Sequence, residues 1–224
     1  MKLGRILVGM FATADALTVF AQAPSQGIAS AHWKSVVSVE GARPGAALQQ
    51  AEIWLRGPVM RIVAREGGSP DVTNLLELDG QLYVWTEGHA EGLRIAAGLA
   101  ANAGRPSYAY VRRVDEIRSH GKKLGSETVA GHLCDVYDYD AGPAGAGKYW
   151  LAGDLKGFPV QAVVERRVVV PMRPSVDRGG VKLLYRNTDV EVPGKVPDAL
   201  LAVPQGVRFQ DATELMGSGR PPRS

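Results

Sequence analysis

The sequence contains very little cysteine and no excess of charge of one sign. Cys134 is the single cysteine among 224 residues, so no disulfide can form within the chain. The 26 basic residues are scattered among 23 acidic residues, and the net charge is +3. A nucleic-acid-binding surface needs clustered basic residues, so we expect no nucleic acid partner.

The sequence also lacks the motifs of common catalytic sites. It has no H-E-x-x-H motif, no G-x-S-x-G motif and no phosphate-binding glycine loop. Five acids around the central strands could form a carboxylate pair or a metal site: Asp135, Asp138, Asp140, Asp154 and Glu165. However, Asp138 and Asp140 stand beside Gly142, where solvated acids are expected. We therefore expect no catalysis, no cofactor and no metal, and a metal- or carboxylate-dependent hydrolase is the least favoured alternative.

The lone thiol stands in an apolar, alternating segment. A single cysteine in this setting is typical of a small buried hydrophobe, and the alternative is a nucleophile or metal ligand. His132 shares a strand face with Cys134, but no third ligand lies near them in the sequence. We expect a buried thiol that reacts slowly.

The first 23 residues have the pattern of a signal peptide. Lys2 and Arg5 precede a mostly apolar run, 6–20, that is too short for an ordinary membrane span. Small residues at 19–23 allow cleavage after position 21 or 23, and the alternative is a buried N-terminal helix. We expect a periplasmic or secreted protein with no membrane span after cleavage, one domain at 24–216 and a disordered tail at 217–224.

Most of the chain reads as short strands joined by turns. Three antiparallel strands are expected at 132–140, 148–152 and 158–170, where turn residues separate the segments most clearly. Further strands are expected before and after them, at 32–40, 50–56, 59–66, 72–78, 81–86, 181–192 and just before 210. Helical patterns occupy 89–103 and 108–120, where Tyr110, Val114 and Ile117 recur at helical spacing. These helices are either packing elements or a lid over the mouth of a sheet.

Asp79-Gly80 is the strongest hairpin signal in the chain. A two-residue turn pairs Leu78 with Gln81, and the remaining pairs follow from this register. Leu76 then lies opposite Tyr83 and Asn74 opposite Trp85. The other face is shared by Leu75, Val84, Glu77 and Leu82. Both faces of this hairpin carry bulky residues, so the sheet must be covered on both sides or line a cavity on one side.

Several of these segments together resemble a known family. They are 52–58 (EIWLRGP), 78–84 (LDGQLYV), the helical stretch after it, and 203–207 (VPQGV). They are similar, in the same order, to the periplasmic lipoprotein-sorting carriers of the LolA/LolB-like superfamily, over roughly residues 32–210. The resemblance implies a mainly β fold, a half-open curved antiparallel barrel of about nine or more strands that is capped by helices and accepts an acyl chain. In the carriers a basic residue immediately precedes the hairpin proline, whereas here Gly57 precedes Pro58 and Arg56 stands one position earlier.

The favoured hypothesis is an exported, non-catalytic carrier or sensor of a hydrophobic ligand, the acyl chain of a lipid or lipoprotein. We expect eight residues to line the hollow: Ile53, Leu55, Met60, Ile62, Leu76, Leu78, Tyr83 and Trp85. The inward face could also be the opposite one, in which case Trp54 would point inward. The alternative function is an envelope protein interaction module that works through sheet edges and loops and binds no small ligand.

Overall fold

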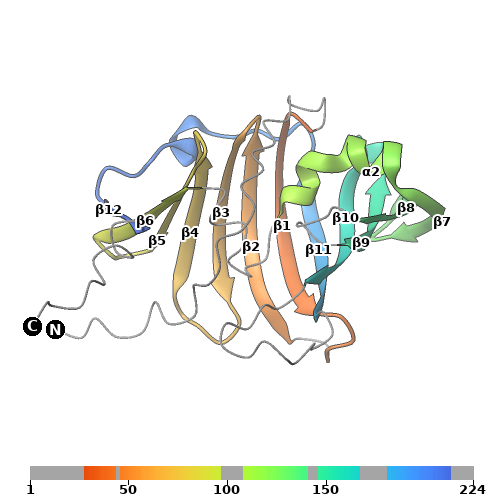
Figure 1. Ribbon diagram of the computed structural model, residues 1–224, viewed down its shortest axis with the longest axis horizontal. Coiled ribbons are helices and arrows are strands. Elements are labelled where there is room, and N and C mark those ends of the chain that lie inside the picture. Colours follow the sequence, from red (N-terminus) through yellow and green to blue (C-terminus); the bar gives the residue numbers. More distant parts are fainter. Residues whose placement is uncertain (1–27, 44–45, 97–107, 141–145, 167–180, 213–224) are drawn as a thin grey trace, which may run out of the picture.

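The computed structural model describes residues 28–43, 46–96, 108–140, 146–166 and 181–212. Within them, twelve strands form one curved sheet in the order β12-β6-β5-β4-β3-β2-β1-β11-β10-β9-β8-β7 (Figure 1). Neighbouring strands run antiparallel, except that β12 and β6 are parallel. The sheet is not closed, which confirms the expected mainly β, half-open barrel.

The bounds of the strands are β1 Ser30–Val39, β2 Ala47–Arg56, β3 Val59–Glu66, β4 Val72–Leu78, β5 Gln81–Thr86, β6 Glu91–Ala96, β7 Lys122–Val129, β8 His132–Asp140, β9 Ala146–Ala152, β10 Phe158–Arg166, β11 Val181–Glu191 and β12 Arg208–Asp211. The helical segments are η1 Ala109–Arg113, α2 Val114–His120, η3 Gly153–Leu155 and η4 Asp198–Leu201. Among the described residues, no helix is long and apolar enough to cross a membrane.

Two meanders build the sheet. Strands β1 to β6 follow one another in space as they do in sequence, and so do β7 to β11. Pairing of β1 with β11, which places Val37 opposite Tyr185, joins the two meanders into one sheet. Figure 1 shows that the strands at both ends lie at a steep angle to the central strands, because the twist of neighbouring strands accumulates across the sheet.

The hairpin at Asp79-Gly80 has the predicted register. The three predicted pairs are present: Leu78 opposite Gln81, Leu76 opposite Tyr83 and Asn74 opposite Trp85. Asp79 and Gly80 have φ values of 50° and 71°, which a two-residue turn with the twist of its flanking strands requires. The helix expected over 108–120 is also confirmed, as the consecutive segments η1 and α2.

Two expectations of secondary structure were wrong. The segment 91–96, expected as helix, is strand β6 between β5 and β12. A Cβ at Gly92 would lie only 2.7 Å from the Phe209 ring and 2.8 Å from the Val84 carbonyl oxygen. The absence of a Cβ at this position therefore allows β6 to lie close to these two residues. Segment 122–129, for which no strand was expected, is strand β7 at the end of the sheet.

Alternation along the strands gives the sheet an inner and an outer face. The inner face is the one that carries Trp33, Ile53 and Tyr185, and it is the face on which η1 and α2 pack. The segment 108–120 is called the cap here. The main hydrophobic core lies between the cap and the inner face, and its members come from β1, β2, β3, β9, β10 and β11.

The outer face carries a smaller core at the β8 end. Cys134 is fully buried there among Val136, Trp150, Ala152 and Val160. Burial raises the pKa of the Cys134 thiol. The expected burial of this cysteine on the central strand is therefore confirmed.

Some expectations fall outside the described residues. These are the signal peptide at 1–23, the tail at 217–224, the helical stretch at 97–103 and the end of the strand expected at 158–170.

Candidate binding site under the helical cap

Four of the eight predicted ligand-binding residues lie together on the inner face. Ile53 pairs with Ile62, and Leu55 pairs with Met60, between β2 and β3. Ile53, Leu55 and Met60 are buried in the core, whereas Ile62 lies half-buried at its margin. These side chains form an apolar floor on the β2–β3 side of the cap.

The other four residues lie on the outer face, so the expectation that all eight share one face was wrong. Arg61, not Met60 or Ile62, is directly opposite Leu76 across β3 and β4. Leu76 in turn shares its face with Leu78, Tyr83 and Trp85 through the β4–β5 register. The turn between Glu66 and Val72 sets this relation, because a shift of one residue exchanges the two faces of a strand.

The cap covers the floor with a row of buried side chains. These are Tyr108, Tyr110, Val111, Val114 and Ile117. The Tyr108 ring lies edge-on to Trp33 at 6.2 Å between centroids, and Tyr110 lies 5.4 Å from Tyr185. Such edge-to-face contacts add about 0.5–1.5 kcal/mol per pair to the gain from apolar burial. Tyr108 and its contacts could not be read from helical spacing, which marks only positions 110, 114 and 117.

Both cap tyrosines hold their hydroxyl groups in hydrogen bonds beneath the cap. Tyr108 donates to Gln49 Oε1 at 3.2 Å. Asn187 Nδ2 donates to the Tyr110 hydroxyl at 3.1 Å and to the Pro159 carbonyl oxygen at 2.7 Å. Burial raises the pKa values of both tyrosines, so they remain neutral donors and acceptors at physiological pH.

A small pocket opens on the inner face beside the cap. Its lining consists of Gln49, Ile62, Ala64, Glu66, Thr73, Leu75 and Tyr108. Its volume of about 20 Å³ accommodates roughly one water molecule. The pocket is too small for an acyl chain, and the buried side chains of the cap pack on the inner face beside it.

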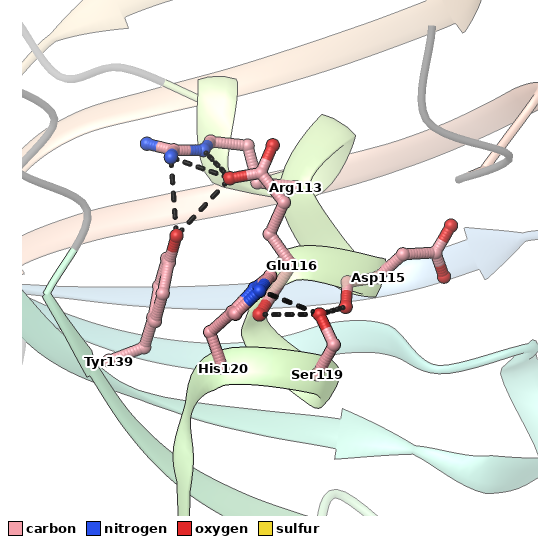
Figure 2. A network of polar contacts seen from close by, with 6 residues as sticks. All are labelled: Arg113, Asp115, Glu116, Ser119, His120 and Tyr139. Carbon is pink, nitrogen blue, oxygen red and sulfur yellow. Dashed lines mark hydrogen bonds and ion pairs between the residues drawn. The ribbon is translucent and has the colours of Figure 1, made fainter.

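Polar contacts hold the cap at both of its sides. Towards β3 and β4, Arg112 donates to Glu77 Oε2 at 2.9 Å and to the Pro58 carbonyl oxygen at 2.8 Å. Towards β8, Tyr139 contacts an ion pair within the cap: Arg113 donates to Glu116 Oε2 at 2.6 Å and to the Tyr139 hydroxyl at 3.2 Å (Figure 2). These contacts join the sheet to a short segment that belongs to no strand.

The acids and histidines near β8 form separate pairs. His132 Nδ1 lies 2.7 Å from Asp154 Oδ2, and Asp135 accepts from Lys123 at 2.8 Å and from Ser126 at 2.6 Å. Within the ranges described above, no group of three or more histidine, cysteine, aspartate or glutamate side chains could hold a metal ion. Two of the five acids considered from the sequence, Asp135 and Asp154, are thus engaged with local partners.

Comparisons with known proteins show similarity of structure alone. No protein-family model matches the sequence, and no curated protein is similar to it in sequence. An uncharacterised conserved protein from Thermus thermophilus matches with a TM-score of 0.50 and 9% identity, over 82% of this chain and 91% of that one. MucB matches at 0.47 and 16%, over 83% and 60%, and a LolA superfamily protein from Nitrosomonas europaea at 0.35 and 14%, over 79% and 91%.

This chain spans 60% of the length of the MucB chain that it matches. Identities of 9–16% concern the fold and carry no function from one protein to another. The function must therefore be argued from the residues of this chain.

Proposed function

We propose that this chain is an exported binding module whose inner face takes up the acyl chain of a lipid or lipoprotein in place of the cap. The observation that supports the proposal is the arrangement of the core. A curved apolar sheet is filled on its inner side by a short segment, 108–120, whose own secondary structure does not depend on the sheet ladder.

The hydrophobic gain from an acyl chain grows with its length. Burial of about twelve methylene groups gains about 10 kcal/mol at ~0.8 kcal/mol each, and burial of about sixteen gains about 13 kcal/mol. Ordering of the chain and association cost about 4 kcal/mol or more, and displacement of the cap subtracts a further amount. A micromolar dissociation constant needs a net gain of about 8 kcal/mol, which about twelve methylene groups do not reach, so the long end of the range from twelve to sixteen carbons is the most suitable.

The split between the two faces supplies a matched pair of variants. Ile62→Asp places a charge on the inner face beside the pocket, whereas Leu78→Asp places the same charge on the outer face of the neighbouring strand. Both positions are partly buried and belong to neighbouring strands of the same meander. Titration of a fluorescent fatty-acid probe should show loss of binding in the first variant and retention in the second, with circular dichroism confirming that both remain folded.

Two results would contradict the proposal. One is a wild-type protein that binds no fluorescent fatty acid at concentrations up to about 100 μM, well above the dissociation constant estimated from area burial. The other is a folded Ile62→Asp variant that binds as well as the wild type. In either case the interaction-module function becomes the better hypothesis.

One observation favours that second candidate. Strand β7 stands at the end of the sheet and is exposed along most of its length, with Leu124 46% exposed and Leu133 on the adjoining strand 68% exposed. An exposed edge can accept an additional strand from a partner protein. A photo-crosslinking residue at Thr128, compared with one at Asp189, should then trap a defined envelope protein in intact cells.

A further inference from the structure

The cap covers the inner face with apolar side chains and also brings a positive charge to it. Arg112 Nη1 donates to Glu77 Oε2 at 2.9 Å, and Arg112 Nη2 donates to the Pro58 carbonyl oxygen at 2.8 Å. The carboxylate belongs to β4, and the carbonyl oxygen belongs to the turn between β2 and β3. Two acceptors from different parts of the sheet therefore bind one guanidinium group.

This pair of acceptors adjoins the apolar floor. Glu77 is directly opposite Met60 on β3, and Met60 is directly opposite Leu55 on β2. Met60 and Leu55 are both buried in the main core. The charge of Arg112 thus stands at the edge of the hydrocarbon surface on which the cap packs.

The inner face of β2, β3 and β4 carries charge of one sign. Every residue of these three strands is described, and the strand registers place two charged side chains on their inner face, Glu66 and Glu77. A ligand that displaces the cap also removes Arg112 from Glu77. A cationic group on the ligand would restore the ion pair, whereas an acidic group in the same place would be repelled.

We propose that the ligand of the inner face is an amphiphile that carries a primary ammonium group beside its hydrocarbon chain. The ammonium group takes the place of the Arg112 guanidinium between Glu77 and the Pro58 carbonyl oxygen, and the hydrocarbon takes the place of the buried side chains of the cap. An ammonium group has three N–H donors, so it can serve both acceptors at once. This inference rests on the proposed function and names the chemical class of its ligand.

Three probes that differ only in one end group test this class. All have a chain of about sixteen carbons and the same fluorophore at the far end, and they end in a primary amine, an alcohol or a carboxylate. Each is titrated into the full-length protein at neutral pH. We expect the amine to bind roughly tenfold more tightly than the carboxylate, with the alcohol between them, because attraction to Glu77 replaces repulsion. The cost of opening the cap is common to all three probes and cancels in this ratio.

A matched pair of variants assigns the preference to Glu77. Glu77→Gln should reduce the ratio to about twofold or less, since the carboxylate is replaced by its neutral counterpart. Glu52→Gln is the control, because Glu52 lies on the outer face of β2 and its side chain is 40% exposed, close to the 37% of Glu77. The control should keep the ratio of roughly tenfold, because a charge on the opposite face is screened from the ligand.

Competition against the bound amine probe separates two sources of this chemistry. Displacement by lysophosphatidylethanolamine and not by lysophosphatidylglycerol would identify an amine-bearing lipid headgroup. Displacement by a palmitoylated peptide that carries a lysine beside its acyl group, and not by the same peptide with glutamine in that place, would identify an acylated polypeptide.

Three results would refute the ligand class and leave the proposed function standing. The first is a carboxylate probe that binds the wild type as tightly as the amine probe does, and this result decides even if Glu77→Gln does not fold. The second is a folded Glu77→Gln variant that keeps the wild-type ratio. The third is displacement of the amine probe by neither the lipid nor the peptide. Binding of none of the three probes would instead refute the proposed function, and this inference with it.

Discussion

The cap contact that most directly tests the proposed function is the one made by Arg112. Arg112→Met keeps most of the apolar stem of the side chain and removes its charge. The change eliminates the ion pair with Glu77 and the hydrogen bond to the Pro58 carbonyl oxygen. In the ion pair, the side chain of Arg112 is 26% exposed and that of Glu77 is 37% exposed. A partly exposed pair contributes about 0.5 kcal/mol and a hydrogen bond from a charged donor at the surface about 1 kcal/mol, so the cap should lose about 1.5 kcal/mol of attachment.

This loss should have opposite effects on stability and on binding. The free energy of unfolding should fall by about 1.5 kcal/mol, because the contacts exist only in the folded protein. If the ligand replaces the cap, the same change lowers the cost of opening, and the apparent affinity should rise about tenfold. Urea unfolding and titration of the fluorescent fatty acid measure the two quantities on the same sample.

Glu77→Gln removes the ion pair from the sheet side and should act in the same direction. The double variant should show less than the sum of the two single effects, since both remove one interaction. Probe binding that weakens in Arg112→Met, or stays unchanged while stability falls, would show that the cap does not have to move for a ligand to enter.

Three further predictions concern other parts of the chain. Cys134 should react with a thiol reagent much more slowly in the folded protein than in denaturant, and Cys134→Ser should lower stability through its buried hydroxyl without changing probe binding; equally fast labelling in both states would contradict this. Gly92→Ala should destabilise the protein by about 1–3 kcal/mol in thermal unfolding because of the contact with Phe209, whereas Gly153→Ala, with no atom within 4 Å of the added Cβ, should be neutral. The hydrogen bond from Arg113 lowers the pKa of Glu116 below its ordinary value of 4.5. The contribution of ionised Glu116 to the free energy of unfolding should therefore be complete above pH 4.5 and decline as the pH falls through the lowered pKa. Glu116→Gln should remove this part of the loss of stability in acid.

Local turn chemistry made much of this fold predictable. Strands β4 and β5 have the expected bounds, because Asp79-Gly80 permits one tight turn and fixes every pair that follows. Strand β6 was not predictable in this way, since its alanine and leucine content favours a helix and only pairing with β5 and β12 overrides that preference. Strand β7 carries too few apolar residues for its alternation to be visible.

The candidate site was predictable in part for a related reason. Alternation within the β2–β3 hairpin placed Ile53, Leu55, Met60 and Ile62 on one face, as the structure has them. The five residues between Glu66 and Val72 form a longer connection whose geometry the sequence does not dictate, so the face of β4 relative to β3 could not be derived. Arg112 was not identified because its partners, Glu77 and Pro58, are distant in sequence.

The choice of tyrosine in the cap bears on whether the cap can move. Tyr108 and Tyr110 fill the inner face with their rings, yet each ends in a hydroxyl group that is hydrogen-bonded beneath the closed cap. If the cap lifts, each hydroxyl can exchange its hydrogen-bond partner in the protein for water. Exposure of a tyrosine side chain to water therefore costs less free energy than exposure of a phenylalanine side chain. Gln49 and Asn187 remain on the sheet as polar groups on an inner face that is mostly apolar. Under the proposed function, a cap of this composition closes the core and would be displaced by a ligand that buries more hydrocarbon than it does.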